Sequence, residues 1–77
     1  MGVLIMIEKV GKYCRDFRID VLGMTIKQLA DITESNTKNI WAFEHGKANS
    51  IKYLYLYYNV CNEHEKETFA RGLFRCL

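Results

Sequence analysis

Hydrophobic residues recur at helical spacing from residue 8 onward. Between Glu8 and Arg18 they stand three, four and seven positions apart, which is the pattern of an amphipathic helix with one buried face. The residues of this face are Val10, Tyr13, Cys14 and Phe17. Residues 1–7 are apolar without such a period, and we expect a loose lead-in, either a short strand or a disordered tail. The segment 18–24 indicates a loop in which Gly23 takes a positive φ.

Polar residues mark the ends of two short helices in the middle of the chain. Thr25 is placed as an N-cap with Gln28 three residues later, which is the spacing of a capping box. The helix that follows is expected to bury Ile26, Leu29, Ala30 and Ile32. Asn36 is the predicted N-cap of the next helix, which runs to about His45. Gly46 is expected to end it, since glycine is common just past a helix.

The segment 51–61 allows two interpretations. Its tyrosines favour a strand by propensity, whereas as a helix, capped by Asn49 or Ser50, it carries two apolar stripes. One stripe holds Ile51, Leu54, Tyr55 and Tyr58, and the other holds Tyr53, Leu56, Tyr57 and Val60. We favour the helix, which then needs cover on both sides. A last helix, from about Glu63 to Arg75, has acids in its first turns and arginines near its end, as the helix dipole favours.

Length and composition indicate one all-α domain. A chain of 77 residues is near the lower limit for a single self-sufficient core, and its 49% hydrophobic content argues against disorder. No proline interrupts the helices. The expected fold is a compact bundle of about five short helices with a central helix-turn-helix. It comprises a lead-in (1–7), a helix-turn-helix domain (8–62) and a C-terminal helix (63–77) that packs or dimerises.

Several classes of function find no support in the residues. Cys14, Cys61 and Cys76 lack the spacing of a zinc site, so we expect reduced thiols, no metal and no cofactor. No nucleophile with a paired base and no glycine-rich phosphate loop stand out, so we do not expect an enzyme. No apolar run approaches the roughly 20 residues of a membrane helix, and the apolar opening is too short for a secretion signal. We expect a cytoplasmic protein without a membrane partner.

The segment 25–46, TIKQLADITESNTKNIWAFEHG, resembles the Cro/C1-type family of DNA-binding proteins, also called lambda-repressor-like or XRE. The family pattern runs from a threonine through Leu-Ala, a polar N-cap and an aliphatic residue to Glu-x-Gly. The matching residues are Thr25, Leu29, Ala30, Asn36, Ile40, Glu44 and Gly46. With VGKYCRDFR before it and SIKYLYLYY after it, the similarity spans about residues 8–60. It implies that the helix 36–45 enters the major groove of DNA.

The resemblance and helical geometry together assign the expected DNA contacts. At about 100° per residue, positions 38, 42 and 45 share a face with 37 and 41 on one flank, while Ile40, Phe43 and Glu44 turn toward the domain. Expected base contacts come from Thr37, Lys38, Trp41 and Ala42. Expected phosphate contacts come from Gln28, Asn36, Asn39, His45, Lys47, Asn49 and Lys52. The alternative for these polar residues is a solvated helix face.

In the resembling family the glutamate of Glu-x-Gly pairs with an arginine late in the first helix. Arg18 matches that arginine, so we expect a partly buried Arg18–Glu44 ion pair. Glu34 stands where the family often has glycine in the turn, and a positive φ there would cost free energy. Ser35 replaces a usual apolar residue. Ile26 stands where many members carry a phosphate-binding glutamine, which weakens one expected backbone contact.

Two functions are compatible with this pattern. The first is a small dimeric transcriptional repressor, of the kind phages and mobile elements use, on a pseudo-palindromic site in double-stranded DNA. Its dimer interface is expected at Tyr57, Phe69, Leu73 and Phe74, although core packing explains these residues equally well. The second is a phage-type protein-binding inhibitor, for example of a host enzyme or defence system, on the same fold. The net charge of only +2 and the missing phosphate-binding glutamine favour this second function.

Overall fold

Helices account for nearly all of the structure. The computed structural model describes the backbone of residues 2–48 and 51–76 and the side chains of residues 8–48 and 51–76. Within these residues the chain forms five α-helices, one π-helical turn and no strand. They are α1 (Gly2–Phe17), the π turn η1 (Arg18–Leu22), α2 (Ile26–Thr33), α3 (Thr37–Glu44), α4 (Lys52–Asn59) and α5 (Glu63–Cys76). The expected all-α fold and the helical interpretation of segment 51–61 are confirmed, whereas the expected caps Asn49 and Ser50 lie outside the described residues.

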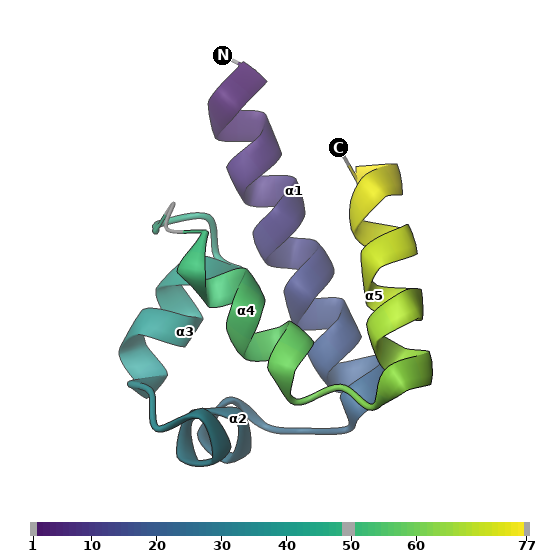
Figure 1. Ribbon diagram of the computed structural model, residues 1–77. Coiled ribbons are helices and arrows are strands. Elements are labelled where there is room, and N and C mark those ends of the chain that lie inside the picture. Colours follow the sequence, from purple (N-terminus) through teal and green to yellow (C-terminus); the bar gives the residue numbers. More distant parts are fainter. Residues whose placement is uncertain (1, 49–50, 77) are drawn as a thin grey trace.

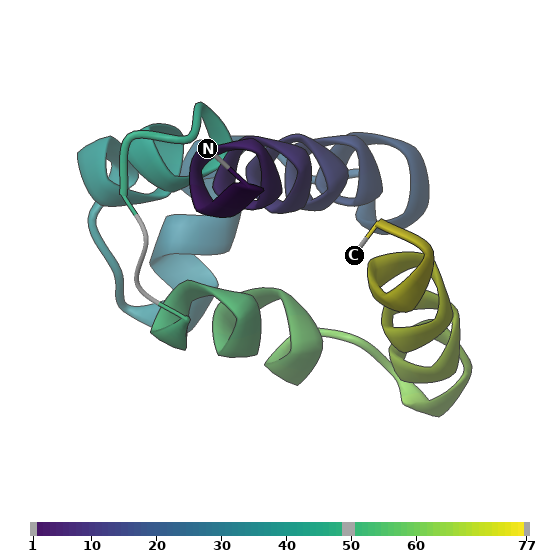
Figure 2. The ribbon, with the colours of Figure 1, turned by 90° about the horizontal axis from the view of Figure 1, so that it is seen from above.

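The long helix α1 connects the two ends of the molecule. It packs against α3 and against α5. Figures 1 and 2 show α5 at one end and the α2–α3 pair at the other, with α4 leading from one to the other. The helix-turn-helix pair therefore projects away from the C-terminal helix.

One core joins all five helices. Its buried residues are Cys14, Phe17, Leu29, Ala30, Ile40, Phe43, Tyr57, Cys61 and Phe69. Phe69 brings α5 into this core, because its ring packs edge-on against Phe17 at 4.8 Å between centroids and stacks with Tyr57 at 6.3 Å. Burying a side chain of this size stabilises the fold by roughly 1.5–3 kcal/mol. The C-terminal helix thus shares the core of the helix-turn-helix region.

The first helix is longer than its sequence pattern indicates. α1 begins at Gly2, so the expectation of a loose lead-in over residues 1–7 is wrong for residues 2–7. A helix that has nucleated extends at little cost through residues that contain no proline. The expected loop after Arg18 is also wrong, because residues 18–22 form the π turn η1. The predicted positive φ at Gly23 is confirmed at 62°.

Two expectations about burial are wrong as well. Ile32 is 60% exposed on α2, because at about 100° per residue it lies about 200° around the helix from the buried Ala30. On α4 the core covers the stripe that contains Tyr57 and, from the other stripe, Leu54. The opposite stripe leaves Ile51 and Tyr55 exposed, so α4 is not covered on both sides.

Candidate functional site

A three-residue turn holds α2 and α3 at a fixed angle. α2 ends in a Schellman arrangement, in which the Ser35 N–H donates to the Ala30 carbonyl at 2.8 Å and Glu34 takes φ 55°. Asn36 then caps α3, and its Oδ1 accepts the N–H of Lys38 at 2.8 Å. The expected N-cap is confirmed, and Glu34 adopts the positive φ that costs free energy for a residue other than glycine. All three residues of the turn therefore take part in joining the two helices.

The outer ends of the pair are closed by the predicted caps. The Thr25 N–H donates to Gln28 Oε1 at 2.8 Å, and the Gln28 N–H donates to Thr25 Oγ1 at 3.1 Å, which completes the capping box. Just past the end of α3, Gly46 has a φ of 72° and the Lys47 N–H donates to the Ala42 carbonyl at 2.8 Å. The pair is therefore a well-bounded helix-turn-helix.

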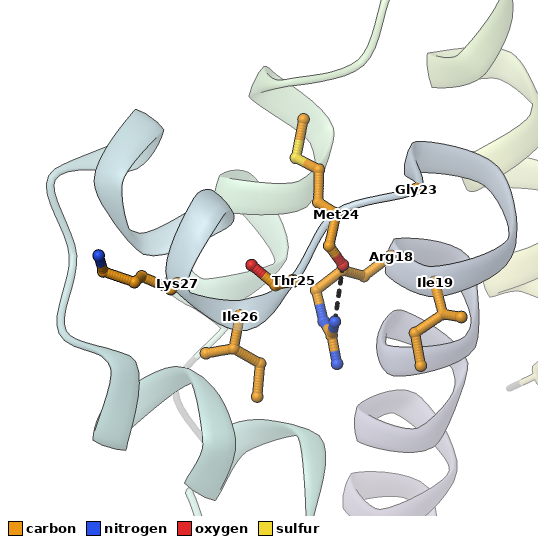
Figure 3. Close-up of a pocket in the computed structure, with 7 residues that line it drawn as sticks. All are labelled: Arg18, Ile19, Gly23, Met24, Thr25, Ile26 and Lys27. Atoms are coloured by element: carbon orange, nitrogen blue, oxygen red, sulfur yellow. Dashed lines mark hydrogen bonds between the residues drawn. The ribbon is translucent and has the colours of Figure 1, made fainter.

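A buried ion pair fixes α3 to the rest of the domain. Arg18 donates to both carboxylate oxygens of Glu44, from Nε at 2.8 Å and from Nη2 at 2.9 Å. Tyr57 donates its hydroxyl to the same carboxylate at 2.7 Å. The remaining arm of Arg18 donates to the Met24 carbonyl at 2.8 Å, and Figure 3 shows the guanidinium between the side chains of Ile26 and Ile19. The expected Arg18–Glu44 pair is confirmed and is more deeply buried than expected.

Burial and hydrogen bonding shift the proton equilibria in this network. The hydrogen bond to Glu44 raises the pKa of Arg18, so the guanidinium stays charged. Burial, and then the bond to Glu44, raises the pKa of Tyr57, so its hydroxyl stays protonated and keeps donating. The network joins η1, α3 and α4 through atoms that cannot easily exchange partners. The network fixes the orientation of α3 through Glu44, the last residue of the helix.

A close helix crossing supports α3 from a second side. A Cβ atom on Gly11 would overlap the carbonyl oxygen of Phe43, so α1 and the last turn of α3 touch through their backbones. The sequence pattern does not single out Gly11 or Tyr57 for these roles. The sequence does contain one indication of the role of Gly11, because a glycine inside an otherwise regular amphipathic helix often has a packing reason.

The opposite face of α3 is open to solvent. Thr37, Lys38, Trp41 and His45 are exposed, and Ala42 is half-buried. The rings of Trp41 and His45 stack at 3.8 Å between centroids and 15° between planes. His45 Nδ1 lies 2.8 Å from the Trp41 carbonyl, which can only accept, so Nδ1 carries a proton and Nε2 is left for another partner. The four residues expected to contact bases thus lie on one accessible side of α3.

A shallow apolar pocket lies on this same side. It is lined by Ile26 at the start of α2 and by Thr37, Lys38 and Trp41 of α3. A neighbouring hollow, drawn in Figure 3, is lined by residues of η1 and of the first turn of α2, and Lys27 stands at its edge. The pocket places Ile26 of α2 beside the expected base contacts of α3. The sequence positions of these residues do not indicate that they lie together.

The residues expected to contact phosphate fall into three places. Asn36, Asn39 and Lys52 line one cleft between the turn and α4. His45 and Lys47 are exposed at the end of α3. Gln28 is exposed on α2, with its Oε1 occupied by the capping box. Asn49 lies outside the described residues.

Charges around the helix pair are mixed. The exposed lysines are Lys27, Lys38, Lys47 and Lys52, and the exposed acids are Asp31 and Glu34. Glu34 shares its cleft with Lys52. Because Glu44 is neutralised by Arg18, the exposed side chains leave a modest positive balance on these two helices and their flanks.

The expected dimer interface is partly wrong. Tyr57 and Phe69 are 0% and 2% exposed because they form the core, so they cannot contact a second copy. Leu73 is half-buried against the same core. Phe74 is 79% exposed and remains available.

A groove lies between α1, η1 and α5. Phe74 does not line it, but its sequence neighbour Arg75 and Arg71, three residues before it, do. Its apolar lining is formed by Tyr13, Phe17 and Val21. One edge carries Asp16 and Asp20, and the α5 edge carries Arg71 and Arg75. The two edges of the groove therefore have opposite charge.

The described residues show no arrangement for a metal or a membrane-spanning segment. No group of three or more His, Cys, Asp or Glu side chains among them is placed to hold a metal ion. The three cysteines are free thiols. None of the helices in the described part of the chain is both long enough and apolar enough to cross a membrane.

Comparison with known protein families, with curated proteins and with solved structures finds no match for this chain. Its function is therefore inferred from the residues and their geometry.

Proposed function

We propose that this protein is a sequence-specific regulator of transcription, a small repressor that inserts α3 into the major groove of double-stranded DNA. The observation that carries the proposal is the contrast between the two sides of α3. Its inner side is fixed by the Arg18–Glu44–Tyr57 network, and its outer side presents Thr37 and Lys38. A helix held rigidly from behind, with free donors in front, suits the reading of base edges.

The dimensions and chemistry of α3 agree with this role. An α-helix with its side chains is about 10–12 Å wide, and the major groove is about 12 Å wide. Lys38 can donate to O6 and N7 of guanine, and the Thr37 hydroxyl can donate or accept. Each good base contact contributes about 1–3 kcal/mol of discrimination. The resemblance of residues 25–46 to the residue pattern of the Cro/C1-type family supports the same assignment.

Phosphate contacts would come from both flanks of α3. Asn36, Asn39 and Lys52 form one cluster, and His45 and Lys47 form another. Such contacts fix the position of the protein on DNA without reading sequence.

A homodimer would double the short reading surface. α3 has eight residues, and two copies about 34 Å apart would read a pseudo-palindromic site. We place the dimer contact at the α1–α5 groove and Phe74. A two-fold axis brings the acidic edge of one copy against the basic edge of the other, so Asp20 would face Arg71 of the second copy.

A protein-binding inhibitor is the second candidate function. The exposed acids Asp31 and Glu34 favour it, since negative charge beside α3 repels the phosphates of DNA. On this reading Trp41 would be an anchor in a protein interface.

Selection of bound fragments from random duplex DNA tests the proposed function. We expect the purified protein to enrich an inverted repeat. An unenriched pool, with no retention on duplex DNA even at low salt, would contradict the proposal and favour the protein-binding function. The fluorescence of Trp41, which is the single tryptophan, gives a second readout at the expected contact.

Two lysine variants test the division of roles on α3. We expect Lys38→Ala to change which base is preferred at one position of each half-site. We expect Lys47→Ala to weaken binding to all sequences alike and to lower the salt dependence by about one phosphate contact. Both residues are exposed, so neither substitution should alter folding. Equal effects of the two on sequence preference would refute the assignment.

The proposed dimer contact has a matched control at the N-cap of α4. Phe74→Glu places a charge in the contact and should shift the protein toward monomer in sedimentation velocity. Ile51→Glu, at a residue exposed to a similar extent (72% against 79%), should leave the oligomeric state unchanged. Dissociation by Ile51→Glu alone would move the contact to α4.

A further inference from the structure

The pocket lined by Ile26, Thr37, Lys38 and Trp41 places apolar surface in the middle of an otherwise polar face. Ile26 is half-buried, and Trp41 is exposed over 45% of its area. The indole is held in place by His45, whose ring stacks on it and whose Nδ1 bonds to the backbone carbonyl of Trp41. Leaving apolar area in water contributes nothing to the stability of the fold. A small apolar group that fills the pocket would remove this area from water, which is favourable.

Building on the proposed function, we propose that this pocket receives the 5-methyl group of a thymine. The other base-edge groups of the major groove are hydrogen-bond donors and acceptors, whereas the thymine methyl is apolar. The pocket is formed by the start of α2 and the outer side of α3, so it lies where a base edge would meet the inserted helix. It reads thymine by contact with Ile26 and Trp41.

The rim of the pocket favours a nucleic acid over a protein side chain as the occupant. Lys38 and Thr37 stand at the rim, and the exposed Lys27 follows Ile26 on α2. Two lysines beside an apolar hollow complement the phosphate charge of DNA. The pocket is open and shallow, which suits a methyl group better than a large anchoring side chain. With the methyl in place, Lys38 reaches an adjacent base pair and Trp41 covers the thymine edge.

Uracil substitution removes this methyl group and changes nothing else in the base. Duplexes of the selected site are prepared with each thymine replaced in turn by uracil, and affinity is measured by fluorescence anisotropy. We expect one thymine in each half-site to be sensitive. Its replacement should weaken binding about fourfold, and replacement in both half-sites about sixteenfold, as expected from about 0.8 kcal/mol for each buried methyl group.

Protein variants then locate the methyl contact. We expect Ile26→Ala to bring the thymine-to-uracil affinity ratio close to one. Ile32→Ala, on the same helix but outside the pocket, should keep the fourfold ratio. Because the ratio compares two duplexes with the same protein, it is insensitive to a general loss of affinity. Trp41→Phe, which keeps an aromatic ring and lies outside the core, provides a second variant and should give an intermediate ratio.

Each outcome decides a different point. Specific binding with no uracil-sensitive position would overturn the pocket assignment and leave the DNA-binding function in place. A fourfold ratio that persists in both Ile26→Ala and Trp41→Phe would place the methyl contact elsewhere and also overturn it. Failure of the protein to bind any duplex would refute both the proposed function and this pocket assignment, and would favour a protein side chain as the occupant.

Discussion

Replacing Tyr57 with phenylalanine removes one oxygen atom from the buried network that orients α3. The hydroxyl donates to Glu44 at 2.7 Å, and the side chain is 0% exposed. Hydrogen bonds to charged groups contribute about 1.5–3 kcal/mol. The carboxylate keeps both bonds from Arg18, so the loss should stay within that range. A domain of this size loses roughly 4–8 °C of Tm for each kcal/mol, which predicts a fall of roughly 6–24 °C.

Urea unfolding followed by circular dichroism measures this effect, with Tyr55→Phe as the matched control. Tyr55 lies on the same helix, is 63% exposed, and undergoes the same chemical change. Its substitution should alter the free energy of unfolding by less than about 0.5 kcal/mol. If Tyr57→Phe falls within 0.5 kcal/mol of Tyr55→Phe, as an order-of-magnitude threshold, the hydroxyl does not stabilise the network and our account of how α3 is held is wrong.

The same variant carries a pH prediction. A tyrosine in the unfolded chain ionises near about pH 10, whereas burial and Glu44 raise the pKa of Tyr57 in the folded state. The stabilisation is therefore complete below about pH 10 and is lost as pH rises above it, because only the unfolded state then releases the proton. We expect the stability gap between wild type and Tyr57→Phe to narrow by about 1.4 kcal/mol per pH unit above pH 10. A gap independent of pH would contradict the raised pKa.

Three further predictions follow from the backbone and the thiols. Gly11→Ala should lower the free energy of unfolding by about 1–3 kcal/mol, because the new Cβ would overlap a carbonyl oxygen of α3. Lys12→Ala, at an exposed position, should not lower it, and equal urea midpoints for the two variants would contradict the close crossing. Glu34→Gly should raise stability by up to about 1 kcal/mol in the same assay, since φ is 55° there, and a loss would show that no strain is relieved. With a thiol reagent near pH 8, half-buried Cys76 should react well before the two buried cysteines, whose pKa values are raised by burial, and three equal rates would be inconsistent with the core.

Local chemistry explains which features of the fold the sequence predicts. Thr25, Asn36 and Gly46 act on backbone groups within four residues of themselves, so their roles as caps can be inferred from spacing alone, and the structure confirms them. The core positions of α3 are likewise predicted by helical periodicity. The Arg18–Glu44 pair joins residues 26 positions apart, and periodicity contains no information about such a contact. Only the family resemblance predicts this pair.

Features that depend on how the helices pack could not be predicted. Tyr55 and Tyr57 occupy equivalent positions on two apolar stripes, and the sequence does not say which stripe faces the core. The assignment of Tyr57 to a dimer surface failed for this reason. The pocket between Ile26 and Trp41 likewise requires the angle between α2 and α3. The start of α1 at Gly2 cannot be predicted from periodicity, because the first residues of the helix have no clear polar face.

The salt dependence of duplex binding tests the central claim most directly. The protein is titrated against the selected duplex and a scrambled duplex while salt is varied, and binding is followed by anisotropy. We expect tighter binding to the selected duplex, with log K falling linearly against log salt by about 0.9 for each phosphate contacted. Equal affinity for both duplexes, or no binding even at about 50 mM salt, would contradict the claim that α3 reads DNA.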